Sequence, residues 1–268
     1  MSGGRRLNIP LIKSVVMAVV GFAIAGGSAV VGIGAQVAAA PAIAFLLGYS
    51  PDVTAGTAIA FALFASASSV VGGHLGGTDV PFALALLLAV CATGGVIFAA
   101  RFADDERLKG ARRLAHLLVM LLGIFIINQT MSPRLGGPQP VGDELLRSPV
   151  GVALVGALAG VASQTFQIPT GVLLVPALIY LCGRTPAEAI LASLFVVALA
   201  SLLPAIASAN RGLVDRRIGP WMTLGGIAGG LAGGWILVRT LGAGSPWPLI
   251  AFSLVAMYLS AVWFWRLR

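Results

Sequence analysis

The stretch "GIGAQVAAAPAIAFLLGYSPD", residues Gly32–Asp52, decides the fold because it interrupts an apolar run that is too long for one membrane crossing. Within Leu11–Gly48 the one charged residue is Lys13. A helix needs about 20 residues to cross a bilayer, yet this longer run contains no polar loop that would divide it into two crossings. Gly34 and Pro41 favour a break, because glycine adopts backbone angles that a helix excludes and proline lacks an N–H group. The sequence therefore predicts a broken or re-entrant helix.

The composition is that of a protein embedded in a membrane. Of its 268 residues, 58% are hydrophobic and 10% are charged, whereas about a quarter of the residues in a soluble protein are charged. Two apolar segments, 37–48 and 171–182, are shorter than a crossing, and the sequence leaves open whether they cross fully or re-enter. Segments long enough to span are Ser14–Gly32, Val53–Gly73, Val80–Ala100, Leu114–Met131, Val150–Phe166, Ile190–Ala209, Ile218–Val238 and Pro246–Trp265. We therefore expect an all-α polytopic membrane protein with 8–10 transmembrane segments.

The formal net charge of +8 would indicate a nucleic-acid partner in a soluble protein. Here the cations fall in loops and termini, where they set topology and meet anionic lipid head groups, so we expect a lipid bilayer and no nucleic acid as partner. The cations before the first apolar run also fit a signal peptide, but hydrophobicity continues far past any cleavage site. We therefore expect an uncleaved first helix. Cys91 and Cys182 lie in apolar segments and are expected to be reduced packing residues.

An internal repeat appears when the sequence is shifted by 135 residues. The shift aligns prolines 41 and 51 with prolines 176 and 186, glycines 21 and 48 with glycines 156 and 183, and serine 28 with serine 163. Two prolines and their flanking glycines match in one register without a gap. The sequence therefore predicts two homologous halves, residues 1–131 and 148–268, joined by a polar linker at 132–147.

The distribution of cations sets the expected topology. If each long apolar stretch crosses once, the 17 lysines and arginines divide 10 to 7 between the two sides. If each broken stretch instead enters the membrane and returns to the side from which it started, the cations divide 13 to 4 between the two sides. The N-terminal arm, the 101–113 loop, the 211–217 loop and the C-terminus then share one side. Each half then crosses an odd number of times. We expect inverted repeats, each with a broken hairpin plus three spanning helices, and both termini in the cytoplasm.

The break recurs at the matching position of the second half, as "QIPTGVLLVP" at Gln167–Pro176. In inverted-repeat transporters, paired interruptions of this kind indicate the binding site. Interrupted helices present N–H groups and a positive dipole end, which suit an anion. An alternative is that the polar residues near the breaks only cap helices or join them. The candidate substrate-binding residues are Gly32, Gly34, Gln36, Thr57, Gln164, Gln167, Thr170, Gly171 and Ser193.

These motifs resemble the TauE/SafE family of membrane transporters, known as sulfite exporters. That family has two related halves, each opening on a "G-x-G-G-G-x-x-x-x-P" type stretch, followed by a short helix, a "G-hydrophobic-x-P" turn and an Ala/Gly-Thr/Ser-rich helix. Residues 32–41, "LGYSP" (47–51) and "TAGTAIA" (54–60) fit in the first half, and residues 167–176, "CGRTP" (182–186) and "AILAS" (189–193) fit in the second. The triple glycine is replaced by Gly34-Ala35-Gln36 and by Pro169-Thr170-Gly171, so the substrate can differ. The resemblance implies transport of sulfite or an organosulfonate.

The expected function is secondary transport of a small anion across the bacterial inner membrane by alternating access. The alternatives are an anion channel or a non-transporting structural subunit. No enzyme activity and no cofactor are expected, because the chain lacks a nucleophile, base or metal cluster and a P-loop. His74 is a candidate for proton coupling, whereas His116 is expected to be solvated. A proton or sodium ion as coupling ion, and a homodimer, are compatible with the sequence.

Overall fold

The structure is a computed structural model that describes residues 11–79, 82–102, 108–131, 145 and 148–266. The expected N-terminal arm, most of the expected linker and part of the 101–113 loop lie outside the described residues. The described part is helical throughout its regular structure, and eight of its helices are long and apolar enough to cross a membrane. This confirms an all-α polytopic membrane protein.

The order of long and short helices is the same before and after residues 132–147. The first group is α1 (Leu11–Val31), the short α2 (Gln36–Leu47), α3 (Pro51–Leu75), α4 (Phe82–Ala99), a 3-10 turn (Ala100–Phe102) and α5 (Lys109–Met131). The second group is α7 (Pro149–Phe166), the short α8 (Thr170–Tyr180), α9 (Pro186–Asn210), α10 (Gly219–Gly242) and α11 (Trp247–Arg266). At a rise of about 1.5 Å per residue, neither α2 nor α8 is long enough to cross a bilayer.

Helix starts follow from local sequence. Both α3 and α9 begin on a proline, at Pro51 and Pro186, where the missing N–H group would have no partner in any case. At α9 the Thr185 hydroxyl accepts from the Glu188 N–H and the Glu188 carboxylate accepts from the Thr185 N–H, each at 3.3 Å. This reciprocal capping box fixes where α9 starts.

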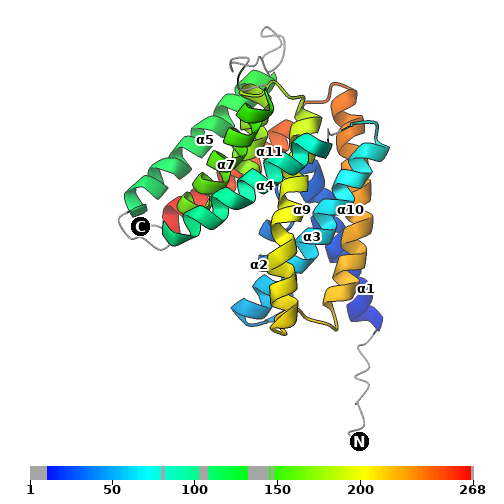
Figure 1. The fold of residues 1–268 in the computed structure, drawn as a ribbon. Helices are drawn as coiled ribbons and strands as arrows, with labels where there is room; N and C mark the ends of the chain where they lie inside the picture. Colours follow the sequence, from blue (N-terminus) through cyan, green and yellow to red (C-terminus); the bar gives the residue numbers. More distant parts are fainter. Residues whose placement is uncertain (1–10, 80–81, 103–107, 132–144, 146–147, 267–268) are drawn as a thin grey trace, which may run out of the picture.

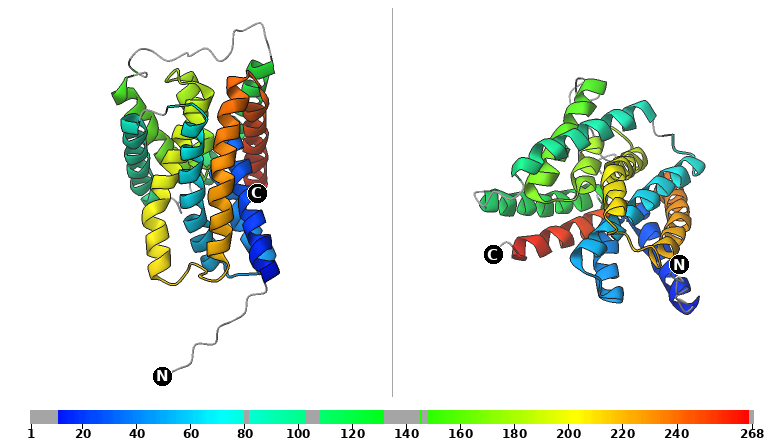
Figure 2. Two further views of the ribbon diagram at one scale, coloured as in Figure 1. Left: turned by 90° about the vertical axis from the view of Figure 1, so that its right-hand side faces the viewer. Right: turned by 60° about the horizontal axis from the view of Figure 1, so that its bottom comes forward.

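Corresponding helices run in opposite directions through the molecule. In Figure 1, α3 runs from the lower end, where α1 begins, to the upper end, whereas α9 runs from the upper end to the lower. The side view in Figure 2 shows the same two directions, with α10 running upward beside α3. We use "lower end" and "upper end" below for these two ends of the molecule.

Helices of the two groups interleave instead of forming two separate lobes. α10 packs along both α1 and α3, α7 packs along α4, and α3 packs against α9. The approach is close because glycines line the contacts: a Cβ atom on Gly225 would overlap the Ala18 carbonyl of α1, and one on Gly95 of α4 would overlap the Ala157 carbonyl of α7. Small residues allow such backbone proximity between helices in a bilayer.

Candidate functional site

The first break separates α1 from α2 at residues 32–35. Gly32 has φ +76°, in the left-handed region that favours glycine. Its N–H donates to the Ser28 carbonyl at 2.8 Å and ends α1. The break packs on α9, since a Cβ atom on Gly32 would lie 2.9 Å from Ile190 and one on Gly34 would lie 3.0 Å from Val197. The α9 side chains therefore cover the first break.

The second break separates α7 from α8 at residues 167–169. Gln167 has φ +57°, and it is the one non-glycine residue with positive φ in the part of the chain that the structure describes. The Ser163 hydroxyl donates to the Ile168 carbonyl at 2.7 Å and lies 2.8 Å from the Thr170 hydroxyl. Such a conformation is uncommon for a side chain other than glycine and persists only where the surroundings hold it. The Ser163–Thr170 pair supplies part of that support.

The two breaks meet inside the bundle. A Cβ atom on Gly171, in the first turn of α8, would lie 3.0 Å from the Gly32 carbonyl oxygen and 3.0 Å from the Ser193 hydroxyl oxygen of α9. Ser193 is fully buried, and its hydroxyl has no hydrogen-bond partner among the described residues. Buried hydroxyl groups are normally paired. The structure thus brings together Gly32, Gly34, Gly171 and Ser193 around an unsatisfied polar atom.

The other sequence-predicted residues are placed differently. Gln36 is half-buried at the start of α2, and Gln164 and Gln167 are half-buried at the end of α7. Thr57 lies away from the breaks, because its hydroxyl accepts a hydrogen bond of 3.0 Å from the N–H of Asp215 in the α9–α10 loop. His74 lies at the molecular surface.

His74 forms an exposed pair. Its Nδ1 lies 2.9 Å from an Asp79 carboxylate oxygen, and the two side chains are 70% and 89% exposed. Exposed pairs of this kind contribute little. The structure therefore separates His74 from the breaks.

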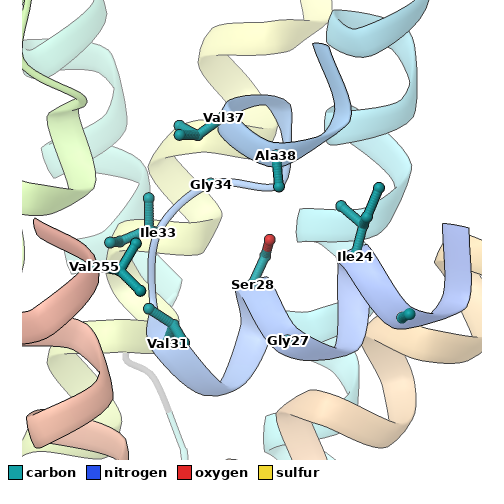
Figure 3. A pocket seen from close by; sticks show the side chains of 10 residues that line it. Ile24, Gly27, Ser28, Val31, Ile33, Gly34, Val37, Ala38 and Val255 are labelled. Carbon is teal, nitrogen blue, oxygen red and sulfur yellow. The ribbon is translucent and has the colours of Figure 1, made fainter. Parts of the chain in front are cut away.

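A cavity of about 230 Å³ lies beside the first break, where the chain reverses between α1 and α2 (Figure 3). Its walls are apolar side chains from α1 and α2 together with Val255 of α11, and Ser28 is the one polar side chain among them. The Ser28 hydroxyl points toward α2 in Figure 3. Ser28 is not among the site residues predicted from the sequence, although the shift of 135 residues aligns it with Ser163, which supports the second break.

Two polar residues of α5 were also missed. Arg112 is 5% exposed, and its Nε donates to the Thr165 carbonyl in the last turn of α7 at 2.9 Å. A cation at a helix C-terminus is favourable. His116, one turn further along α5, is 1% exposed, so the expectation that it is solvated is wrong. Their spacing of four residues places both on one face of α5. This spacing is the signal in the sequence that could have indicated that the two side chains are buried together.

At the lower end, Asp215 takes part in four hydrogen bonds, two within the α9–α10 loop and two that join this loop to Tyr49 and Thr57. The Tyr49 hydroxyl donates to one Asp215 carboxylate oxygen at 2.5 Å, and the N–H groups of Arg217 and Ile218 donate to the same carboxylate at 2.8 and 3.3 Å. The Asp215 N–H donates to the Thr57 hydroxyl. We call the Tyr49–Asp215–Thr57 group the clasp.

The clasp is insensitive to pH near neutrality. Burial, followed by the hydrogen bond to Asp215 and the charge of that residue, raises the pKa of Tyr49 from 10.0 to about 12. A raised pKa stabilises the protonated, donating form, so this contribution is fully present below pH 10 and is lost only as the pH rises through about 12. Opening the clasp at neutral pH therefore requires a conformational change, not deprotonation of Tyr49.

The upper end contains a hollow, in contrast to the lower end, where the clasp lies. A hollow of about 690 Å³ lies between the end of α3, the start of α9 and the last two turns of α10. It reaches Ala187 of α9, one helical turn before Ile190, which covers Gly32. Arg239 lines the hollow, and its guanidinium lies 5.4 Å from the ring centre of Trp235. The hollow thus approaches the first break from the upper end.

These features define a multi-pass helical membrane protein in which two interrupted helices meet. The chain belongs to the Sulfite exporter TauE/SafE family, whose model matches residues 17–264. Two curated relatives of Xylella fastidiosa are each named "Probable membrane transporter protein". The protein of strain 9a5c is 29% identical over 82% of each chain, and that of strain Temecula1 / ATCC 700964 is 28% identical over 92% of each chain. No solved structure matches the chain. The protein is therefore a membrane transporter of this family.

Proposed function

We propose that the protein is a secondary transporter that moves a small anion by alternating access and binds it where the two breaks meet. The observation that carries this proposal is the contact between the breaks: Gly32 of the first and Gly171 of the second lie together beside the unpaired hydroxyl of Ser193. Paired interruptions at the contact of two repeats are the arrangement in which inverted-repeat transporters hold their substrates.

The chemistry around the breaks suits an anion. Both α2 and α8 begin at a break, so their positive dipole ends are directed toward the same region. The candidate side chains there are amides and hydroxyls, which donate hydrogen bonds without placing a charge in the bilayer. The family description names sulfite. Sulfite or an organosulfonate is accordingly the proposed substrate.

The difference between the two ends supports alternating access. Tyr49 and Thr57 of the clasp have Arg184 and Ala192 at the matching positions of the second half, so the clasp has no counterpart at the upper end. Hydrogen bonds between the two halves hold the lower end together. The upper end is hollowed as far as the turn of α9 that covers Gly32. We infer that this conformation is held together at the lower end and hollowed toward the upper end, with Ile190 still covering Gly32.

We also propose that the halves are inverted repeats in the bacterial inner membrane with both termini in the cytoplasm. The opposite directions of α3 and α9 and the 13-to-4 division of cations support this orientation. The lower end is then cytoplasmic.

Reporters inserted in two loops test the orientation. A cytoplasmic reporter is expected to be active in the Arg211–Arg217 loop and inactive at Gly244–Ser245, because these loops flank α10. A periplasmic reporter should give the reverse pattern. Periplasmic activity at 211–217 would contradict the proposed orientation.

Proteoliposomes containing the purified protein test the proposed function. We expect saturable counterflow of labelled sulfite or sulfoacetate, with competition by the unlabelled anion, after a screen that includes thiosulfate, taurine and simple carboxylates. An ohmic anion current without counterflow would show a channel. Neither counterflow nor current with any of these anions would contradict the proposal.

Removing the Ser193 hydroxyl is expected to weaken substrate binding. A hydrogen bond to a charged partner contributes about 1.5–3 kcal/mol, so Ser193→Ala should raise the Kd of the transported anion roughly 10- to 100-fold. The measurement is isothermal titration calorimetry in detergent. The matched control is Ser253→Ala, because Ser253 is equally buried but its hydroxyl already donates to the Leu249 carbonyl at 2.8 Å. An equal Kd in the two variants would remove Ser193 from the site.

A further inference from the structure

The imidazole of His116 is buried, and the packing around it does not explain why it carries two polar ring nitrogens. It lies on α5 and is 1% exposed, and neither ring nitrogen has a hydrogen-bond partner among the residues that the structure describes. Its ring stacks on Trp263 of α11, with centroids 6.5 Å apart and ring planes at 4°. Stacking alone does not account for a histidine, because a phenylalanine would stack there without burying two polar atoms.

Such a group is costly unless another state of the protein satisfies it. A neutral imidazole carries one donor and one acceptor, and both remain unpaired in this conformation. Leaving buried polar atoms unpaired destabilises a structure more than removing them would. The ring therefore needs a partner or a proton at another stage of the transport cycle.

His116 is connected to the second break through its own helix. One turn earlier, Arg112 donates from Nε to the Thr165 carbonyl, two residues before the left-handed Gln167. This half-buried hydrogen bond links the end of α7 at the break to α5. The connection from Gln167 to His116 thus consists of two residues of α7, one hydrogen bond and one turn of α5.

The charged side chains that the structure describes on the helix of His116 are all positive. Its own helix carries Lys109, Arg112 and Arg113, and no aspartate or glutamate occurs on α5 or on the packed helices α7 and α11. The titratable side chain described on α11 is Tyr258, which is 68% exposed. Cations close to a histidine oppose its protonation, and a nearby anion favours it. Occupation of the breaks by an anion would therefore favour the imidazolium form.

We propose that His116 is the proton-coupling residue: it takes up a proton when the anion binds and releases it when the anion leaves, so that anion and proton move together. The inference rests on the proposed function. It assigns proton coupling to His116 in place of the sequence-predicted candidate His74, which forms an exposed pair with Asp79 at the surface. The coupling is reciprocal, because a proton on His116 must strengthen anion binding by the same factor that the anion favours protonation.

The test compares His116→Phe with His74→Phe in proteoliposomes that enclose a pH-sensitive dye. Sulfoacetate and sulfite are the probes, and protein-free liposomes correct for passive passage of protonated anion. His116→Phe keeps the ring stack on Trp263 and removes both nitrogens. At saturating anion we expect it to retain counterflow within about twofold, because exchange needs no net proton movement, and to lose substrate-dependent acidification of the lumen. Its apparent affinity for the anion should fall, because the favourable coupling to the proton is lost. The wild type and His74→Phe should show both activities.

The outcomes separate the coupling from the transport function. Acidification that persists in His116→Phe, or a wild type that gives counterflow without acidification, overturns the coupling role. Loss of counterflow together with acidification in His116→Phe also overturns it, since the residue would then serve binding or folding. Absence of counterflow in the wild type would contradict the proposed function itself.

Discussion

A cleavable linker between positions 49 and 215 is expected to abolish transport, and cleaving it is expected to restore transport. The clasp joins the α2–α3 corner to the α9–α10 loop, with the Tyr49 hydroxyl 2.5 Å from the Asp215 carboxylate. If the lower end must open once in each cycle, a covalent bridge there stops the cycle. The variant is Tyr49→Cys with Asp215→Cys in a Cys91→Ser, Cys182→Ser background, treated with a disulfide-containing bifunctional thiol reagent. The measurement is counterflow in proteoliposomes before and after reduction.

The controls for this bridge are the two single-cysteine variants. Each reacts with the reagent but cannot be bridged within the chain, so each should transport equally before and after reduction. Binding in detergent should survive the bridge, because the hollow at the upper end stays open. Transport by the fully bridged protein would exclude opening at the clasp.

Replacement of Gly225 by alanine is expected to lower thermal stability sharply. A Cβ atom there would overlap the Ala18 carbonyl on the backbone of α1, and backbone cannot move aside as the end of a flexible side chain can. Overpacking of this kind costs about 1–3 kcal/mol, which corresponds to a Tm roughly 2–12 °C lower for a protein of this size. The readout is the Tm of the detergent-purified protein together with its monodispersity.

Gly242 provides the matched control on the same helix, because a Cβ atom there meets nothing within 4 Å. Gly242→Ala should leave the Tm unchanged or raise it slightly, because Gly242 is the last residue of α10 and the preference of a helix interior for alanine over glycine, about 1 kcal/mol, applies there only in part. The adjacent pair in α4 repeats the comparison, with Gly95→Ala destabilising and Gly94→Ala neutral. Equal effects at Gly225 and Gly242 would contradict close packing of α1 on α10.

The positions of the breaks and of the helices after them could be predicted from sequence because they depend on local chemistry. Proline is favoured at the first position of a helix, so Pro51 and Pro186 place the starts of α3 and α9 without knowledge of their neighbours. The rule is not general, because Pro41, Pro176 and Pro204 lie inside α2, α8 and α9. A glycine ends one where the backbone turns left-handed, as at Gly32. The all-helical membrane fold follows from apolar segments of sufficient length.

Contacts between helices could not be predicted in the same way. Thr57 and Ser193 both lie on the helices that follow the breaks, yet the structure places Ser193 where the breaks meet and Thr57 against Asp215. Which face of a helix lies inward depends on its crossing angles with partners far away in the chain. His116 shows the same limit, because closeness to charged residues in sequence suggested solvent, whereas α5 turns that face toward α7 and α11.

The pairing of α1 with α10 and of α4 with α7 has a consequence for biosynthesis. Translation delivers α1 to α5 to the bilayer first, and at that moment the helices that α1 and α4 pack against have not been made. The glycine faces of α1 and α4 can close only after α7 and α10 have been inserted. A chain truncated after α5 would therefore remain a set of inserted but unassembled helices, open to quality-control proteases until its second half arrives.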